Sequence, residues 1–178
     1  MIPIAHPGVA YLLYAGITRA SGKGTPTGHA TIALTVGALL PDLIDQPLYV
    51  VFDLPSTRTV FHSLVVAVPV CLAVAFVAHR GLLRNDIGAG FIVGYLSHPF
   101  ADALWPLVYR EFDELWFLFW PLTPSPPYQG QRILVSIEGH AILTTWVELG
   151  LLGIAIGLWW RHGTPGLALI RQRLPISH

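Results

Sequence analysis

The stretch Ile87–Val108, IGAGFIVGYLSHPFADALWPLV, is apolar over the length of a membrane-spanning helix, yet it carries His98 and Asp102. A run of roughly 17–25 apolar residues is long enough to cross a bilayer as a helix. The two ionisable side chains are four residues apart, so they share one face of such a helix. An Asp at the centre of a membrane helix costs about 2.5–3.5 kcal/mol, and such residues typically mark functional sites. The stretch therefore predicts a membrane helix that contributes to a polar site.

The rest of the chain is also rich in apolar residues and poor in charged ones. Of its 178 residues, 53% are hydrophobic and only 11% are charged, whereas soluble domains have about 25% charged residues. Basic and acidic residues balance at 10 each, which argues against a nucleic-acid partner. The single cysteine, Cys71, excludes a disulfide framework and a Cys-based zinc site. The composition predicts an integral membrane protein whose partner is the lipid bilayer, and it leaves the oligomeric state open.

Five apolar stretches organise the chain. We predict an all-α fold with a single transmembrane domain over residues 1–178. It is a polytopic membrane helical bundle of about five transmembrane segments, at residues 4–17, 28–52, 62–78, 87–108 and 141–160. Pro7 is expected to break the first segment, and Pro41 and Pro47 the second, because proline removes a helical hydrogen bond. The aromatic run within residues 111–127 predicts an interfacial or re-entrant segment, because Trp and Tyr favour the membrane boundary.

The basic residues predict the orientation in the membrane, because Lys and Arg are enriched on the cytoplasmic side. If all five stretches cross, seven of the ten basic residues share one side, together with the C-terminus: Arg19, Lys23, Arg80, Arg84, Arg161, Arg171 and Arg173. At about 1.5 Å per helical residue, most ionisable residues of the apolar stretches then fall in one layer of the outer half. We therefore expect a multi-pass cell-membrane protein whose site is near the extracytoplasmic face.

Imidazoles and carboxylates make up this layer. Asp42 and Asp45 are three residues apart and lie on one helix face, directly after Pro41. Three carboxylates at membrane depth need a common positive partner, which a metal ion supplies. Imidazole and carboxylate without thiolate suit zinc, with manganese or iron as alternatives. The predicted metal ligands are His6, Asp42, Asp45, His62, His98 and Asp102.

Two further residues are predicted to act in catalysis. Arg58 is one turn before His62 if that segment is helical, and it can bind a phosphate or an oxyanion. Glu148 lies at a similar depth in the last apolar stretch, although it is also placed to bond only a Thr or Trp neighbour. Other interpretations remain open: Asp42 and Asp45 as helix caps, and His98 with Asp102 as a proton relay. Three histidines are expected at the opposite membrane face, outside the site: His29, His79 and His162.

Four sequence elements occur in the order seen in a known family. They resemble motifs of small membrane-bound, metal-dependent hydrolases whose bacterial member is controlled by LexA. The resemblance covers about residues 4–121, and the spacing D-x-x-D is similar to that of a subgroup from salt-loving archaea. The four elements are Gly37–Pro47 (GALLPDLIDQP), Arg58–Ser63 (RTVFHS), Gly94–Asp102 (GYLSHPFAD) and Phe117–Pro121 (FLFWP).

The resemblance implies a membrane hydrolase that acts on a lipid or lipid-linked phosphoester through a metal-activated water. Two positions that carry His in the family are Gln46 and Thr57 here, so the resemblance implies one ion rather than two. Two other functions remain open from the residues alone. The buried acids fit an ion- or proton-translocating protein, although a relay needs polar groups through the whole membrane. They also fit a non-catalytic scaffold with a structural metal site, which closed coordination would favour.

Overall fold

The computed structural model describes residues 1–54, 56–124 and 139–173. Within these residues helices are the regular secondary structure and no strand is present, which confirms the all-α prediction. Each of the five predicted segments coincides with one long helix to within a few residues at each end. The elements are η1 (Pro3–Ala5), α1 (His6–Ala20), α2 (Gly28–Phe52), α3 (Leu64–His79), α4 (Asn85–Tyr109), η2 (Phe112–Phe119), α5 (Gly139–Arg161) and α6 (Leu167–Arg173).

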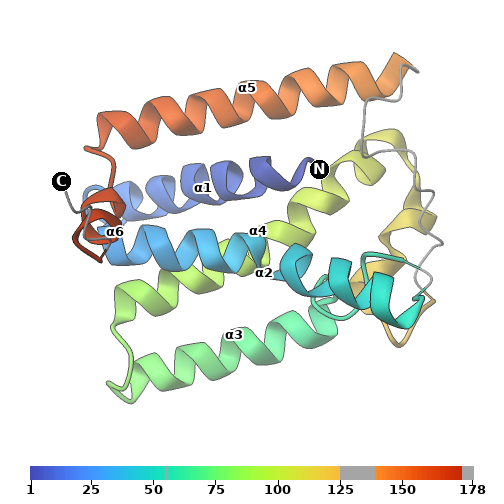
Figure 1. Ribbon diagram of the computed structural model, residues 1–178, viewed down its shortest axis with the longest axis horizontal. Helices are drawn as coiled ribbons and strands as arrows, with labels where there is room; N and C mark the ends of the chain where they lie inside the picture. Colours follow the sequence, from blue (N-terminus) through green and yellow to red (C-terminus); the bar gives the residue numbers. More distant parts are fainter. Residues whose placement is uncertain (55, 125–138, 174–178) are drawn as a thin grey trace.

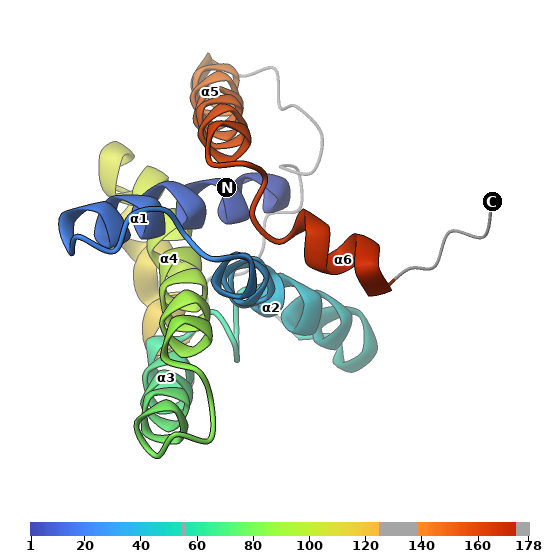
Figure 2. The same ribbon diagram turned by 90° about the vertical axis from the view of Figure 1, so that its left-hand side faces the viewer.

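The helix α4 is the centre of the bundle. It packs against α1, α2 and α3, and the short 3-10 helix η2 lies beside its C-terminal part. Figure 1 shows the helices α1 to α5 extending along the long axis of the molecule. Viewed from the end in Figure 2, α5, α1, α4 and α3 follow one another, and α2 lies beside α4. Residues of α2 and α4 therefore meet in the interior.

Glycines allow α2 and α4 to approach closely. A Cβ atom added at Gly37 would lie 2.5 Å from the carbonyl oxygen of Phe91, and one at Gly94 would overlap the carbonyl oxygen of Leu34. Small residues at a helix crossing let two backbones come together, a common device in membrane bundles. The close crossing places the carboxylates on α2 next to the polar residues on α4.

Replacing Gly94 with alanine is therefore expected to lower the stability of the protein. The added methyl group overlaps the backbone of α2, so the helices must separate, at a cost of about 1–3 kcal/mol. The thermal unfolding midpoint of the detergent-solubilised protein measures this effect. Gly150→Ala is the matched control, because a Cβ at Gly150 meets no atom within 4 Å. Equal midpoints for the two variants would contradict the close packing of α2 and α4.

The predicted proline breaks are wrong. Pro7 lies in the first turn of α1, where an N–H group would have no helical acceptor, so it begins the helix rather than breaking it. Helix α2 continues through Pro41 and Pro47 from Gly28 to Phe52. Each internal proline removes one hydrogen bond and the turns on either side maintain the helix.

Only part of the predicted membrane topology is supported. Among the described residues, two helices are long and apolar enough to cross a membrane, Gly28–Phe52 and Ile142–Arg161, and the apolar helix Leu64–His79 is shorter. A bundle of five spans is therefore not confirmed. Helix α4 has 25 residues, as α2 does, but it includes charged and polar side chains such as His98 and Asp102. The residues that build the site thus also weaken the apolar character of its central helix.

Apolar side chains cover the outer surface of α5. Leu143, Trp146, Ile154 and Trp160 are between 61% and 75% exposed. A contiguous apolar surface of this kind marks contact with a membrane or another protein. The surface fits a helix that faces lipid.

Candidate metal centre

The carboxylate of Asp45 organises the loop that carries His62. Asp45 is fully buried on α2, and its oxygens accept hydrogen bonds from the backbone N–H groups of Thr59, Phe61 and His62 at 3.0–3.2 Å. It also accepts from Nδ1 of the His62 ring at 2.8 Å. Helix α3 begins at Leu64 after this loop, with Ser63 as its N-cap, so His62 precedes the helix. Because Nδ1 of His62 is bonded to Asp45, the Nε2 atom on the other side of the ring faces away from Asp45.

This geometry gives Asp45 partners other than the predicted metal ion. We predicted a metal ligand, but Oδ1 accepts from the N–H of Phe61, and Oδ2 accepts from backbone N–H groups and from Nδ1 of His62. A carboxylate that accepts from the second nitrogen of a ligand histidine fixes the ring orientation and its tautomer. Asp45 is thus a positioning residue for His62.

His98 is held in an equivalent way. It is fully buried on α4, and its Nδ1 atom lies 2.6 Å from the carbonyl oxygen of Ala38 on α2. A carbonyl can only accept a hydrogen bond, so Nδ1 carries the proton and the neutral ring leaves a lone pair on Nε2.

The two histidines point their Nε2 atoms at each other, 3.1 Å apart. Both Nδ1 atoms are bonded to acceptors, so the contact between the Nε2 atoms holds either a proton that one ring donates to the other or a cation that both lone pairs bind. The Oδ1 atom of Asp42 lies 3.5 Å from Nε2 of His62 and 3.8 Å from Nε2 of His98. The Oδ2 atom of Asp42 is buried without a hydrogen-bond partner. These three side chains form a donor cluster that suits a cation.

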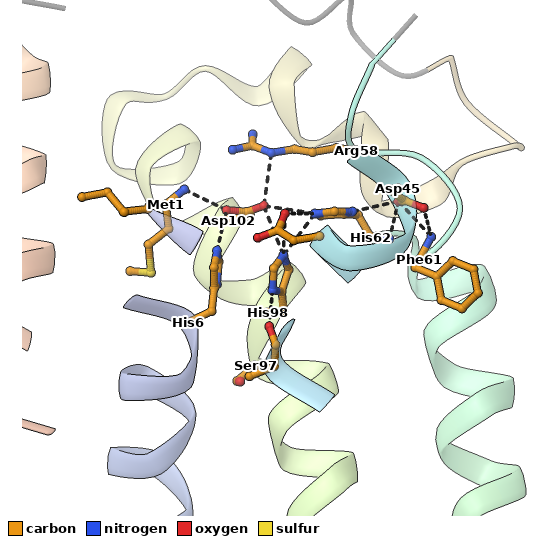
Figure 3. A network of polar contacts seen from close by, with 12 residues as sticks. Met1, His6, Asp45, Arg58, Phe61, His62, Ser97, His98 and Asp102 are labelled. Carbon is orange, nitrogen blue, oxygen red and sulfur yellow. Dashed lines mark hydrogen bonds and ion pairs between the residues drawn. The ribbon is translucent and has the colours of Figure 1, made fainter. Parts of the chain in front are cut away.

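Asp102 lies close to His62 and His98 as well, as Figure 3 shows. Its Oδ2 atom lies 3.7 and 3.8 Å from the Nε2 atoms of His62 and His98, and it accepts from Nε of Arg58 at 3.1 Å. Its Oδ1 atom lies 3.4 Å from Nε2 of His6 and 2.8 Å from the backbone nitrogen of Met1. The ring of His6 stacks on that of His98 with centroids 3.7 Å apart.

Within the described residues, these side chains form two groups that can hold a metal ion. One group is Asp42, His62 and His98, and the other is His6, His98 and Asp102. In each group the donor atoms lie within 4.8 Å of one another. Five of the six predicted ligands thus come together, and only Asp45 lies outside both groups. None of the histidines expected elsewhere belongs to either group: His29, His79 and His162.

The side chain of Phe117 forms an aromatic wall of the site that sequence reasoning missed. It is fully buried in η2, its ring lies 6.4 Å from that of His62, and the guanidinium of Arg58 lies 5.5 Å from its centre. The hydroxyl of Ser63 donates to the carbonyl oxygen of Trp120, which anchors the end of η2. Phe117 thus places part of the predicted interfacial segment, residues 111–127, against the site. Residues 125–127 of that segment lie outside the described residues.

Glu148 lies near the cluster but binds other partners. It is buried on α5, where Oε2 accepts from the backbone N–H of Ile2 at 2.7 Å and Oε1 accepts from Nε1 of Trp105 at 2.6 Å. These bonds connect α5 to the N-terminal segment and to α4. The expected bond to a Trp is present, and the predicted catalytic role stays a prediction.

The fold and the site define an all-helical protein with a buried cluster of side chains that could hold a metal ion. The chain belongs to the YdjM inner membrane protein family, whose family model matches residues 1–171. The match includes α5, beyond the part of the chain in which we found sequence motifs. Searches of the curated proteins and of the solved structures found no match. The membrane location follows from the family, and the hydrolase activity and the archaeal subgroup stay predictions.

Proposed function

We propose that the protein is a membrane-embedded, metal-dependent hydrolase of lipid or lipid-linked phosphoesters. The observation that carries the proposal is the pair of Nε2 atoms of His62 and His98, 3.1 Å apart and backed by hydrogen-bond acceptors on both Nδ1 atoms. The carboxylates of Asp42 and Asp102 lie within 3.8 Å of this pair and add negative charge. Imidazole with carboxylate suits zinc, and also manganese or iron.

The electrostatics of the cluster favour a divalent cation. Asp42, Asp45 and Asp102 bring three carboxylates into a largely buried region, against the guanidinium of Arg58 and the amino group of Met1. Buried charges are stable only when they are paired. A divalent ion held there supplies Lewis acidity and a water whose pKa is lowered to ~7.

Arg58 is placed to bind the anionic part of a substrate. Its Nε atom donates to Asp102, its guanidinium packs on Phe117, and its side chain remains 24% exposed. A guanidinium has five N–H donors in a planar fork that matches phosphate oxygens. The side chain thus presents a fixed positive charge beside the metal-ligating groups, where a phosphoester would bind.

A lipid-linked substrate fits the surroundings of the site. Apolar side chains are exposed on the two elements that adjoin it, the C-terminal turn of α2 and the 3-10 helix η2. Phe52 is 65% exposed at the end of α2, and Phe112 and Phe119 are 58% and 51% exposed on η2. Exposed apolar side chains that gather beside a site mark contact with a membrane or another protein. An acyl or isoprenoid chain can therefore stay in lipid while its phosphate reaches Arg58.

The experiment that tests this function is metal-dependent phosphate release. The purified full-length protein in detergent is stripped of metal with a chelator and incubated with lipid phosphates, lipid pyrophosphates and phosphodiesters, with and without added zinc or manganese. We expect release from at least one lipid phosphoester, abolished by the chelator and restored by metal. Release that is insensitive to the chelator would contradict the proposal, and metal binding without turnover of any substrate would favour the scaffold.

We also propose that the site faces the extracytoplasmic side of a multi-pass protein, as the basic residues predict. Asp113 on η2 and Asn85 at the start of α4 are both exposed, so that cysteines there can react. A membrane-impermeant thiol reagent should label Asp113→Cys in intact cells and leave Asn85→Cys unlabelled. The wild type is the control, because its Cys71 is buried. Labelling of Asn85→Cys alone would place the site on the cytoplasmic side.

A further inference from the structure

The carboxylate of Asp102 divides its two oxygens between two sets of nitrogen donors. Oδ2 lies 3.1 Å from Nε of Arg58 and 3.7 and 3.8 Å from Nε2 of His62 and of His98. Oδ1 lies 2.8 Å from the nitrogen of Met1 and 3.4 Å from Nε2 of His6. In Figure 3, His6 lies below Asp102 and His62 lies to its right. Each oxygen therefore faces a different imidazole, so a cation could bind at each.

His6 has no other polar partner that accounts for its position. Its side chain is 1% exposed, its Nδ1 atom is buried without a hydrogen-bond partner, and its ring is stacked on His98 with an interplanar angle of 18°. Buried polar groups are normally satisfied by hydrogen bonds. The stacking keeps Nε2 of His6 close to Asp102, so a cation at Nε2 would account for the buried imidazole.

We propose that a second divalent cation binds between Nε2 of His6 and Oδ1 of Asp102, with Asp102 as the bridge to the first ion. The inference rests on the metal site of the proposed function. His6, His98 and Asp102 are together within metal-binding reach. His98 has one nitrogen to offer, because its Nδ1 atom is bonded to Ala38. If His98 holds the first ion, the second ion has two ligands from these side chains and takes the others from water or an anion.

This second ion binds more weakly than the first. The backbone nitrogen of Met1 lies 2.8 Å from the same Oδ1 atom, so the ion must displace this contact. The first ion also offsets much of the negative charge of the carboxylates, so a second cation gains less from them. An anion such as phosphate adds oxygen ligands and negative charge, and therefore strengthens the binding of the second ion. The chemical class that the complete site takes is a phosphate group held by two cations and Arg58.

Manganese binding to the metal-free, full-length protein tests the proposal. Free Mn²⁺ is measured by electron paramagnetic resonance during a titration, with and without inorganic phosphate. We expect two ions per chain at saturation, one tight and one weak, and a dissociation constant of the weak site at least tenfold lower with phosphate. His6→Phe keeps an aromatic ring against His98 and removes the nitrogen donors, so it should lose only the weak ion. His79→Ala is the control, because His79 is exposed at the end of α3.

A single ion per wild-type chain at saturation, with or without phosphate, would overturn the proposal. So would two ions in His6→Phe, because the weak ion would then bind elsewhere. If phosphate leaves the dissociation constant of the weak site unchanged, the claim that both ions bind one phosphate is refuted. Two ions in the wild type and one in His6→Phe, without hydrolysis of any phosphoester, would support the second site and reject the hydrolase. The absence of any bound ion would reject both.

Discussion

Replacing His98 with alanine is expected to remove the tightly bound metal ion and, with it, the phosphate release. His98 supplies Nε2 to both groups of donor atoms, so no other single substitution affects the whole cluster as strongly. Removal of one well-placed electrostatic group in an active site costs roughly 10²–10³ in rate, and loss of the ion is expected to cost more. Metal analysis and the phosphate-release assay on the same preparation measure both effects.

The control for this variant is His79→Ala. His79 is exposed at the end of α3 and outside both donor groups, so its replacement should leave metal content and activity unchanged. His98→Ala also removes the hydrogen bond to Ala38, and circular dichroism should therefore accompany the assay. Full metal content in a folded His98→Ala protein would show that the ligands lie elsewhere.

Arg58→Gln is expected to give the second large effect, on turnover rather than on metal. The guanidinium lies beside Asp102 and over Phe117, where it binds the phosphate oxygens in our account. Loss of one such charged donor lowers kcat/KM by roughly 10²–10³. Arg58→Lys retains the charge without the planar fork and should recover only part of this loss.

The metal content separates this role from a structural one. Arg58→Gln should retain the tightly bound ion, because the nitrogen donors of His62 and His98 remain in place. If the variant loses the ion together with activity, Arg58 supports the fold of the cluster and does not act on substrate. Normal turnover in Arg58→Gln would remove it from the site altogether.

Helices could be predicted well from the sequence, but membrane crossings could not. Apolar runs in the sequence locate α1 to α5. An apolar helix must be covered by protein or by lipid, so its position can be predicted without knowing its neighbours. The predicted breaks at Pro7 and Pro41 were wrong, since the effect of a proline depends on its position in the helix. The crossing of α2 and α4 at Gly94 depends on contacts between distant segments, which periodicity cannot show.

Much of the site could also be predicted. Spacings of three and four residues correctly place Asp42 on α2, and His98 and Asp102 on α4, within a common cluster. Spacing cannot show which nitrogen of a neighbouring ring a carboxylate will face. Asp45 therefore looked equivalent to Asp42, although the loop after α2 turns His62 so that Nδ1 faces Asp45.

Residues far apart in the chain explain the remaining differences. Phe117 reaches His62 through the packing of η2, and the sequence showed only an aromatic run that resembles a family motif. Glu148 on α5 accepts hydrogen bonds from Ile2, which precedes α1, and from Trp105 on α4. Such contacts depend on the tertiary arrangement of whole helices, and no local pattern in the chain reports them.

X-ray absorption spectroscopy of the zinc-loaded protein tests the central claim most directly, because it reports the ligands of the ion without reference to any substrate. We predict nitrogen and oxygen ligands at about 2.0–2.2 Å, with the outer-shell scattering of imidazole rings, reduced in His62→Ala. A spectrum without imidazole scattering, or a protein that binds no zinc after loading, would contradict the assignment of this cluster as a metal centre.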